Sequence, residues 1–173
     1  MTPEQFKESI LFEDKYLLVV NKPAEMAVEK ISPAIITMED LAFSYLSLSV
    51  KKPYIGIIHR LDRPTSGVLL MAKKPSVLKI MNTQFEKKTI KKIYLATVEG
   101  NFSSIEGKLN HFLNKDTVQK KGIISKERVH GSQEAKLKYR KMQSNEDHSL
   151  LQIELITGKY HQIRTQLAAL GKP

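Results

Sequence analysis

The chain has 173 residues, with 28 lysines and arginines against 18 aspartates and glutamates, which gives a formal net charge of +10 and a pI of about 9.7. This excess of cations favours a polyanionic partner such as nucleic acid, although a lysine-rich surface can also serve solubility alone. The absence of cysteine excludes disulfides and thiolate chemistry, the five histidines lack close metal-ligand spacing, and no stretch resembles a membrane span or a secretory signal, so we expect a soluble, cytoplasmic protein without a metal.

Apolar residues recur at helical or strand spacing along most of the chain, with Gly, Pro and Asn between the repeats. In chain order, we expect a helix at residues 3–11, a strand at 16–20, a helix at 37–48, strands at 55–61 and 68–72, a helix at 75–85, a strand at 93–98, a hairpin of strands at 136–142 and 150–156, and a helix at 160–170. Residues 101–132 are polar and weakly patterned, and predict loops with short strands. Hairpin-like pairs dominate, so the fold class is α+β with a mixed, mostly antiparallel sheet and flanking helices.

One polar loop between two predicted strands concentrates reactive groups. Residues 59–67 read His-Arg-Leu-Asp-Arg-Pro-Thr-Ser-Gly and place Asp62 between Arg60 and Arg63. Opposite charge on both sides should keep this carboxylate ionised, which suits a nucleophile or a group that stabilises developing charge. A structural ion-pair cluster that joins the two strands would give the same pattern. Ser66 lacks the elbow pattern of a nucleophilic serine and reads as a turn residue.

This string resembles the signature of the RluA-type pseudouridine synthases, whose usual form is His-Arg-Leu-Asp, a basic residue, a variable position and Thr-Ser-Gly. Three further segments resemble the same family in the same order: residues 17–23 with their Asn-Lys-Pro end, residues 92–100, and the string Thr-Gly-Lys-Tyr-His-Gln-Ile-Arg at 157–164. The resemblance extends from about Phe12 to the last residue. It implies the pseudouridine synthase catalytic fold for residues 1–173.

The resemblance implies that uridine in transfer or ribosomal RNA is isomerised to pseudouridine without a metal, nucleotide or organic cofactor. Asp62 matches the family's nucleophile, and whether it attacks ribose C1′ or uracil C6, or removes a ribose proton, is left open. The target base must leave its stack to reach this carboxylate. By resemblance, Tyr94 lies against the flipped base and could help to remove the C5 proton, while Arg164 holds the Asp62 carboxylate.

Other residues of the matched strings are expected to bind RNA rather than to react. These are His59, Arg60, Arg63, Thr65 and His161. A structural role explains His59 equally well. Tyr94 could instead pack on a sheet face, and Arg164 could contact a phosphate or lie at the surface.

Some positions depart from the family pattern. Glu25 stands where the family commonly carries glycine, and Glu29-Lys30 stands where His-Pro is usual, so substrate preference could differ. Pro64 replaces an often acidic residue and stiffens the loop. Family members normally continue beyond the equivalent of Pro173, and some carry an N-terminal RNA-binding module. We therefore expect a catalytic domain that is truncated at the C-terminus, has no such module and is a monomer.

Two other classes of function compete with this interpretation. A basic RNA-binding protein could keep the same scaffold without turnover, but Asp62 argues against it, because an anionic carboxylate among phosphate-binding residues repels the ligand. A metal-dependent nuclease would need clustered carboxylates, and only Asp62 is suitably placed.

Overall fold

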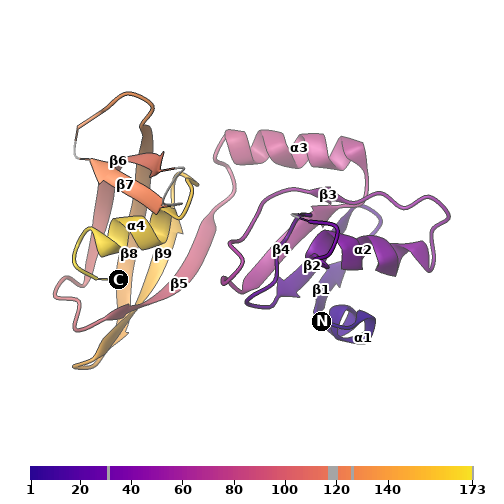
Figure 1. Cartoon of the computed structure of the whole chain (residues 1–173), viewed down its shortest axis with the longest axis horizontal. Coiled ribbons are helices and arrows are strands. Elements are labelled where there is room, and N and C mark those ends of the chain that lie inside the picture. Colours follow the sequence, from indigo (N-terminus) through magenta and orange to yellow (C-terminus); the bar gives the residue numbers. More distant parts are fainter. Residues whose placement is uncertain (31, 117–120, 126, 173) are drawn as a thin grey trace. The chain divides into compact units, whose positions relative to one another are not determined.

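A computed structural model describes residues 1–30, 32–116, 121–125 and 127–172. The chain forms two compact units, Met1–Thr89 and Ile90–Pro173, each with its own sheet and helices (Figure 1). All strand pairings in the described ranges are antiparallel. The predicted α+β class is thus confirmed, with the strands divided between two sheets.

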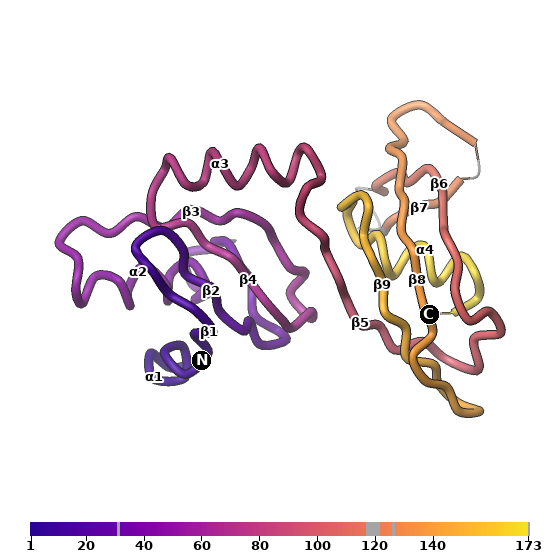
Figure 2. The backbone as a smooth tube through the Cα atoms, turned by 180° about the vertical axis from the view of Figure 1, so that it is seen from behind, coloured from indigo at the N-terminus to yellow at the C-terminus, as the bar shows by residue number. Residues whose placement is uncertain are grey.

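The first unit is a four-stranded sheet with three helices. Its elements are α1 (Pro3–Glu8), β1 (Ile10–Glu13), β2 (Leu17–Lys22), α2 (Met38–Ser47), β3 (Gly56–Ile57), β4 (Gly67–Ala72) and α3 (Pro75–Glu86). The strand order is β1-β2-β4-β3, which Figure 2 shows from behind. Alternate residues of β2, namely Leu18, Val20 and Lys22, are buried. Lys22 pairs with Gly67, so the end of β2 lies beside the loop that enters β4.

Two predictions for this unit are wrong in extent. The helix expected at residues 3–11 ends at Glu8, and its last residues form β1, whose Ile10 pairs with Val20. A capping box of Thr2 and Gln5 starts the helix, but the apolar run after Ser9 is stabilised by pairing with a strand instead. The strand expected at residues 55–61 is reduced to Gly56–Ile57.

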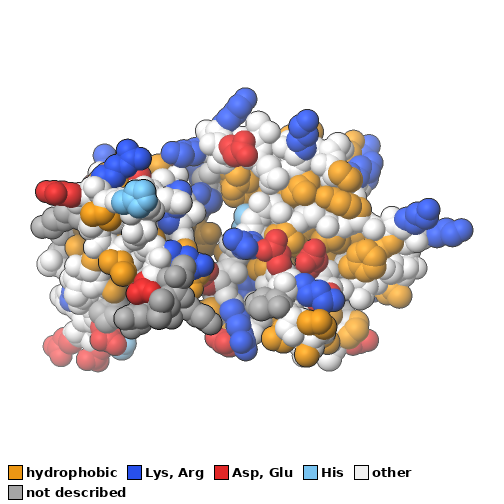
Figure 3. Space-filling view, turned by 45° about the horizontal axis from the view of Figure 1, so that its top comes forward, with side chains coloured by type: hydrophobic (Ala, Val, Ile, Leu, Met, Phe, Trp, Pro, Cys, Tyr) orange, Lys and Arg blue, Asp and Glu red, His pale blue; other side chains and the backbone are white. Residues whose placement is uncertain are grey.

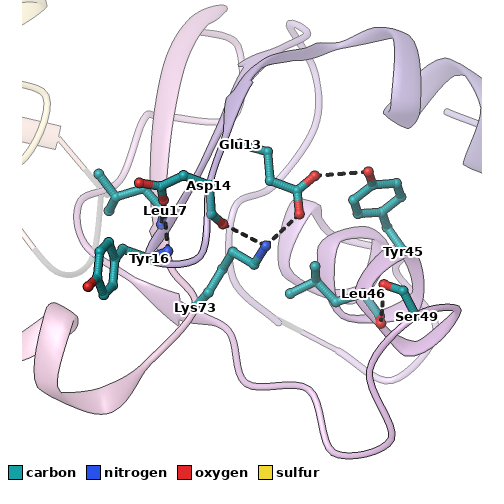
Figure 4. A network of polar contacts seen from close by, with 8 residues as sticks. All are labelled: Glu13, Asp14, Tyr16, Leu17, Tyr45, Leu46, Ser49 and Lys73. Atoms are coloured by element: carbon teal, nitrogen blue, oxygen red, sulfur yellow. Dashed lines mark hydrogen bonds and ion pairs between the residues drawn. The ribbon is translucent and has the colours of Figure 1, made fainter.

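A polar network ties the β1–β2 turn to α2 and to the end of β4 (Figure 4). The Asp14 carboxylate accepts the backbone N–H groups of the residues two and three positions later, at 2.7 and 2.6 Å, and these bonds lower its pKa. Lys73 Nζ donates to Glu13 Oε1 at 2.5 Å and to the Asp14 carbonyl at 2.8 Å, and the Tyr45 hydroxyl donates to Glu13 Oε2 at 2.9 Å. The network therefore stabilises the hairpin formed by β1 and β2.

Asp40 makes the stability of this unit depend on pH. It forms a capping box with Thr37, whose hydroxyl donates to Asp40 Oδ2 at 2.8 Å, and this bond is the main reason that the Asp40 pKa lies below its ordinary value. A lowered pKa contributes stability above the ordinary value of about 4, and this contribution is lost as the pH falls through the folded-state pKa. We expect Asp40→Asn to remove that pH dependence, worth about 1 kcal/mol or less. Urea unfolding of both proteins between pH 6 and pH 3 measures it, and Asp147→Asn should leave the profile unchanged.

The second unit is a five-stranded sheet with one helix. Its elements are β5 (Lys92–Glu99), β6 (Glu106–Asp116), β7 (Lys121–Ser125), β8 (Gln133–Ser144), β9 (His148–Leu155) and α4 (Gln162–Ala168), in the strand order β5-β9-β8-β6-β7. The helix lies over one face of the sheet (Figure 1), where Leu167 joins a core that includes Val98, Leu137, Leu151 and Ile153. The predicted hairpin is confirmed as β8 and β9.

The expectation of loops with short strands at residues 101–132 is wrong for β6, whereas β7 is a short strand as expected. β6 is 11 residues long and pairs with both β7 and β8, while residues 117–120 and 126 lie outside the described structure. Only Leu109 and Leu113 of β6 are buried apolar residues. The alternation that would predict a long strand is therefore too sparse to recognise. No helix of the described residues is long and apolar enough to cross a membrane.

Candidate active site

The loop between β3 and β4 presents Asp62 from the first unit. Buried Ile58 and Leu61 anchor its first half, and Gly67, with φ of 129°, begins β4. The backbone N–H of Thr65 donates to the carbonyl of Asp62 at 2.9 Å, which closes a turn directly after the aspartate. Asp62 itself is half-buried. The fold therefore holds its backbone in a defined turn while leaving the residue accessible to solvent.

Lys22 is a part of this site that the sequence interpretation missed, because the strand predicted at residues 16–20 ends before it, whereas β2 extends to Lys22. Its side chain is completely buried, and its ammonium donates to the carbonyls of Pro23 and Met26 at 2.8 Å each and to that of Arg63 at 3.1 Å. Burial lowers the pKa of Lys22, against the opposing effect of the negative charges on Glu25 and Asp62. A buried cation thus holds the backbone of the Asp62 loop. One feature of the sequence could have indicated that Lys22 is buried. It follows Leu18 and Val20 at the next alternate position of an apolar strand.

The His59 ring joins the same loop to its supports. Its Nε2 accepts the backbone N–H of Leu70 at 3.2 Å, so this nitrogen is unprotonated in that bond. The ring also stacks on Phe85 of α3, with centroids 5.5 Å apart and planes 22° from parallel. These contacts favour the structural explanation for His59.

The arginines on either side of Asp62 pair with glutamates of residues 23–30. Arg60 Nη1 lies 3.1 Å from Glu29 Oε2, and Arg63 Nε lies 3.6 Å from Glu25 Oε2. The positive charge expected beside Asp62 is therefore shared with two other carboxylates.

A hollow of about 510 Å³ lies next to this segment, and its volume is typical of small-ligand sites. Its lining includes residues 23–27, Ile35, Ile36 and Arg63.

Tyr94 lies on β5 of the second unit. It pairs with Ile153 of β9 and, like Ala96 two residues on, packs against the buried core on the face that carries α4. The ring is only partly buried. Packing on a sheet face, the structural alternative for Tyr94, is therefore present, and the partly exposed ring can still offer a surface for stacking.

α4 is shorter than the helix predicted at residues 160–170. It begins at Gln162, because His161 takes a left-handed conformation with φ of 50° as its N-cap and stacks on Tyr160 at 3.8 Å. Arg164 is exposed. Leu170, the last residue of the predicted helix, lies beyond α4 and is 42% exposed. The buried face consists of Gln162, Gln166 and Leu167.

Two buried glutamines fix α4 to the sheet, and the sequence interpretation assigned them no role. Gln162 Oε1 accepts from the Thr157 hydroxyl at 2.9 Å, and its Nε2 donates to the Lys136 carbonyl at 3.1 Å and to Gln166 Oε1 at 3.0 Å. Gln166 Nε2 in turn bonds the carbonyls of Leu109 and Ala135, at 3.3 and 3.1 Å. The network therefore sets the position of the helix that carries Arg164.

We expect Gln166→Leu to destabilise the second unit by about 2–4 kcal/mol, because it leaves buried amide and carbonyl groups without partners. Amide hydrogen exchange followed by mass spectrometry should show faster exchange in β6, β8 and α4, with the first unit unchanged. Gln143→Leu, at an exposed position of β8, is the matched control. Equal protection in the two variants would contradict a stabilising role for this network.

The structure groups the predicted site residues within each unit. His59, Arg60, Asp62, Arg63 and Thr65 share the β3–β4 loop, whereas Tyr94, His161 and Arg164 belong to β5 and the N-terminal part of α4. Asp62 belongs to one unit and Tyr94 and Arg164 to the other, and their contact stays a prediction. Lysine and arginine side chains are exposed on both units (Figure 3), and the described residues contain no cluster of three His, Asp or Glu suited to a metal.

Known proteins share this sequence and fold. A family model for RNA pseudouridylate synthase matches residues 16–169. The chain is 33% identical over 183 residues to ribosomal large subunit pseudouridine synthase D of Borreliella burgdorferi, covering 100% of this chain and 54% of the relative. It is 35% identical over 175 residues to an uncharacterized RNA pseudouridine synthase of Bacillus subtilis, covering 99% and 57%.

Solved structures agree in fold. The human RNA pseudouridylate synthase domain containing 4 superposes with a TM-score of 0.83 at 22% identity, over 99% of this chain and 68% of the human chain. The chain therefore belongs to the RNA pseudouridylate synthase family and is of the RluA type. It spans about half the length of the curated relatives that it matches.

Proposed function

We propose that residues 1–173 form a catalytic domain that isomerises uridine to pseudouridine in RNA. The observation that carries the proposal is that the family match spans Asp62, Tyr94 and Arg164, the three residues expected to act on the substrate. Several relatives, among them the Borreliella burgdorferi protein, are named for the large ribosomal subunit, which favours ribosomal RNA over transfer RNA as the substrate. The exposed lysines and arginines would supply phosphate contacts. We place this activity in the cytoplasm.

The reaction requires one carboxylate from the protein and accurate positioning of that carboxylate against the uridine. The bond from ribose C1′ to uracil N1 breaks, the base turns, C5 bonds to C1′, the C5 proton leaves and N1 gains a proton, so the overall composition is unchanged. Asp62 would act as an anion, either through a transient bond to C1′ or C6 or by removing a ribose proton. The turn closed by Thr65 and the bonds from Lys22 support this role, because they restrict the backbone around Asp62.

The second unit would receive the flipped base. Tyr94 offers a partly exposed ring on a firmly packed strand, which suits stacking on uracil. Arg164 projects from a helix fixed by Gln162 and Gln166, and would pair with the Asp62 carboxylate. The left-handed backbone of His161 is the kind of local strain that occurs at functional sites.

Tritium release from RNA that carries C5-labelled uridine tests this function. We expect release from large-subunit ribosomal RNA with this chain, or with a form extended to the full length of its relatives, accompanied by pseudouridine in the digested product. A protein that binds the RNA in both forms but releases no tritium from ribosomal or transfer RNA would instead be the non-catalytic RNA-binding protein on this scaffold.

A further inference from the structure

Residues 23–30, directly after β2, place a carboxylate on each arginine that flanks Asp62. Glu29 Oε2 meets Arg60 Nη1 at 3.1 Å, and Glu25 meets Arg63 through both its carboxylate, at 3.6 Å, and its backbone oxygen, at 3.2 Å. The arginine side chains are 74% and 64% exposed. Both guanidinium groups are thus within reach of an RNA phosphate while already engaged by the protein.

The position of these carboxylates is set by the fold. The first two backbone N–H groups of α2 donate to the carbonyls of Ala27 and Val28, at 3.0 Å each, and both residues are buried. The Lys22 ammonium also donates to the Met26 carbonyl at 2.8 Å. The segment between the two glutamates is therefore anchored at its centre, so that Glu25 and Glu29 face the Asp62 loop from a fixed backbone.

Glu25 has a backbone conformation that is unfavourable for residues other than glycine. Its φ of 62° lies in the left-handed region, which glycine adopts without penalty and a glutamate does not. Backbone geometry alone would favour glycine here. The contact that a glutamate adds is the ion pair with Arg63, which indicates that the carboxylate itself has a function.

We propose that Glu25 and Glu29 are specificity-determining residues that compete with RNA phosphates for Arg63 and Arg60. The inference rests on the proposed RNA substrate. An exposed ion pair is weak, so an RNA whose backbone reaches both arginines can displace both carboxylates. An RNA whose phosphates reach only one of the arginines gains little binding free energy, and it is repelled by the carboxylate that still pairs with the other arginine. The two glutamates would thus suppress unselective binding beside the nucleophile.

Fluorescence anisotropy with two labelled RNAs tests the proposal, using an oligouridylate as the unselective probe and a large-subunit ribosomal RNA transcript as the structured one. We expect Glu25→Gln and Glu29→Gln each to tighten oligouridylate binding about two- to fivefold, the size of an exposed ion pair. The double variant should tighten it about as much as the two effects combined. Its affinity should also fall more steeply with salt, and its preference for the transcript should decrease.

Two controls separate this effect from net charge and from backbone strain. Glu134→Gln removes a carboxylate that pairs with Lys136 in the second unit and changes the net charge equally. Glu25→Gly relieves the left-handed backbone as well as removing the charge, so agreement between the Gly and Gln variants assigns the effect to the carboxylate. If Glu134→Gln tightens binding as much as the others do, or if preference for the transcript is unchanged, the inference is overturned. If the wild-type chain binds neither RNA, the proposed substrate itself fails and the inference fails with it.

Discussion

Replacing Asp62 with asparagine is expected to reduce tritium release from C5-labelled uridine by about a thousandfold or more. Asparagine has nearly the same size and can keep the backbone turn to Thr65, but it is neither a nucleophile nor an anion. All three routes open to Asp62 need the ionised carboxylate. RNA affinity should stay the same or rise, because a negative charge near the phosphates is lost.

The controls for this experiment address fold and charge. Asp147→Asn, in the turn between β8 and β9, removes an equal charge far along the chain and should leave the rate unchanged. Asp62→Glu keeps the charge but lengthens the side chain by one methylene, so a large loss of rate there would show that placement also matters. A rate for Asp62→Asn within about tenfold of the wild type would remove Asp62 from the nucleophilic role.

Lys22→Met is expected to destabilise the first unit by about 3 kcal/mol or more and to loosen the Asp62 loop. Methionine can fill the buried channel of the lysine stem, but it leaves the carbonyls of Pro23, Met26 and Arg63 without their shared donor. Urea unfolding measures the stability, and hydrogen exchange of residues 60–67 measures the loop. Activity should fall together with loop protection, because the turn that positions Asp62 is no longer held.

Lys51→Met, at an exposed position, is the control for charge and should change neither quantity. The pH dependence gives a second signature. Because the folded-state pKa of Lys22 lies below its ordinary value, the unfolded chain binds the proton more tightly, and on this group alone stability rises with pH between the two pKa values. The Lys22→Met variant should lack that rise. An unchanged loop in Lys22→Met would mean that the three carbonyls find other donors.

The sequence singles out candidate reactive residues but not the residues that support them. Asp62 stands out because two arginines and a nine-residue string surround it, whereas Lys22 reads as a surface cation until three carbonyls are placed around its ammonium. Gln162 and Gln166 are similar, since a pattern of hydrophobic residues cannot reveal a helix that is docked through amides.

The elements that sequence reasoning misplaced are those defined by strand pairing. Residues 10–13 have the composition to extend a helix, and only pairing with β2 makes them a strand. β6 has few apolar residues, and its backbone is held between β7 and β8. Such contacts join residues that are far apart in the chain, so local patterns do not predict them. The helix predicted at residues 37–48 is confirmed, and its capping pair of Thr37 and Asp40 is a local contact.

The seven residues of α4 are too few to be helical alone in water, so the helix depends on the strands beneath it. Its two glutamines reach carbonyls of β6 and β8, and Thr165 approaches β7 where Gly122 has no side chain. Arg164 therefore acquires its orientation only when strands that begin as far back as Glu106 have assembled. We therefore expect folding of the second unit and orientation of Arg164 to occur together, and a peptide of residues 157–172 on its own should be a disordered coil in water.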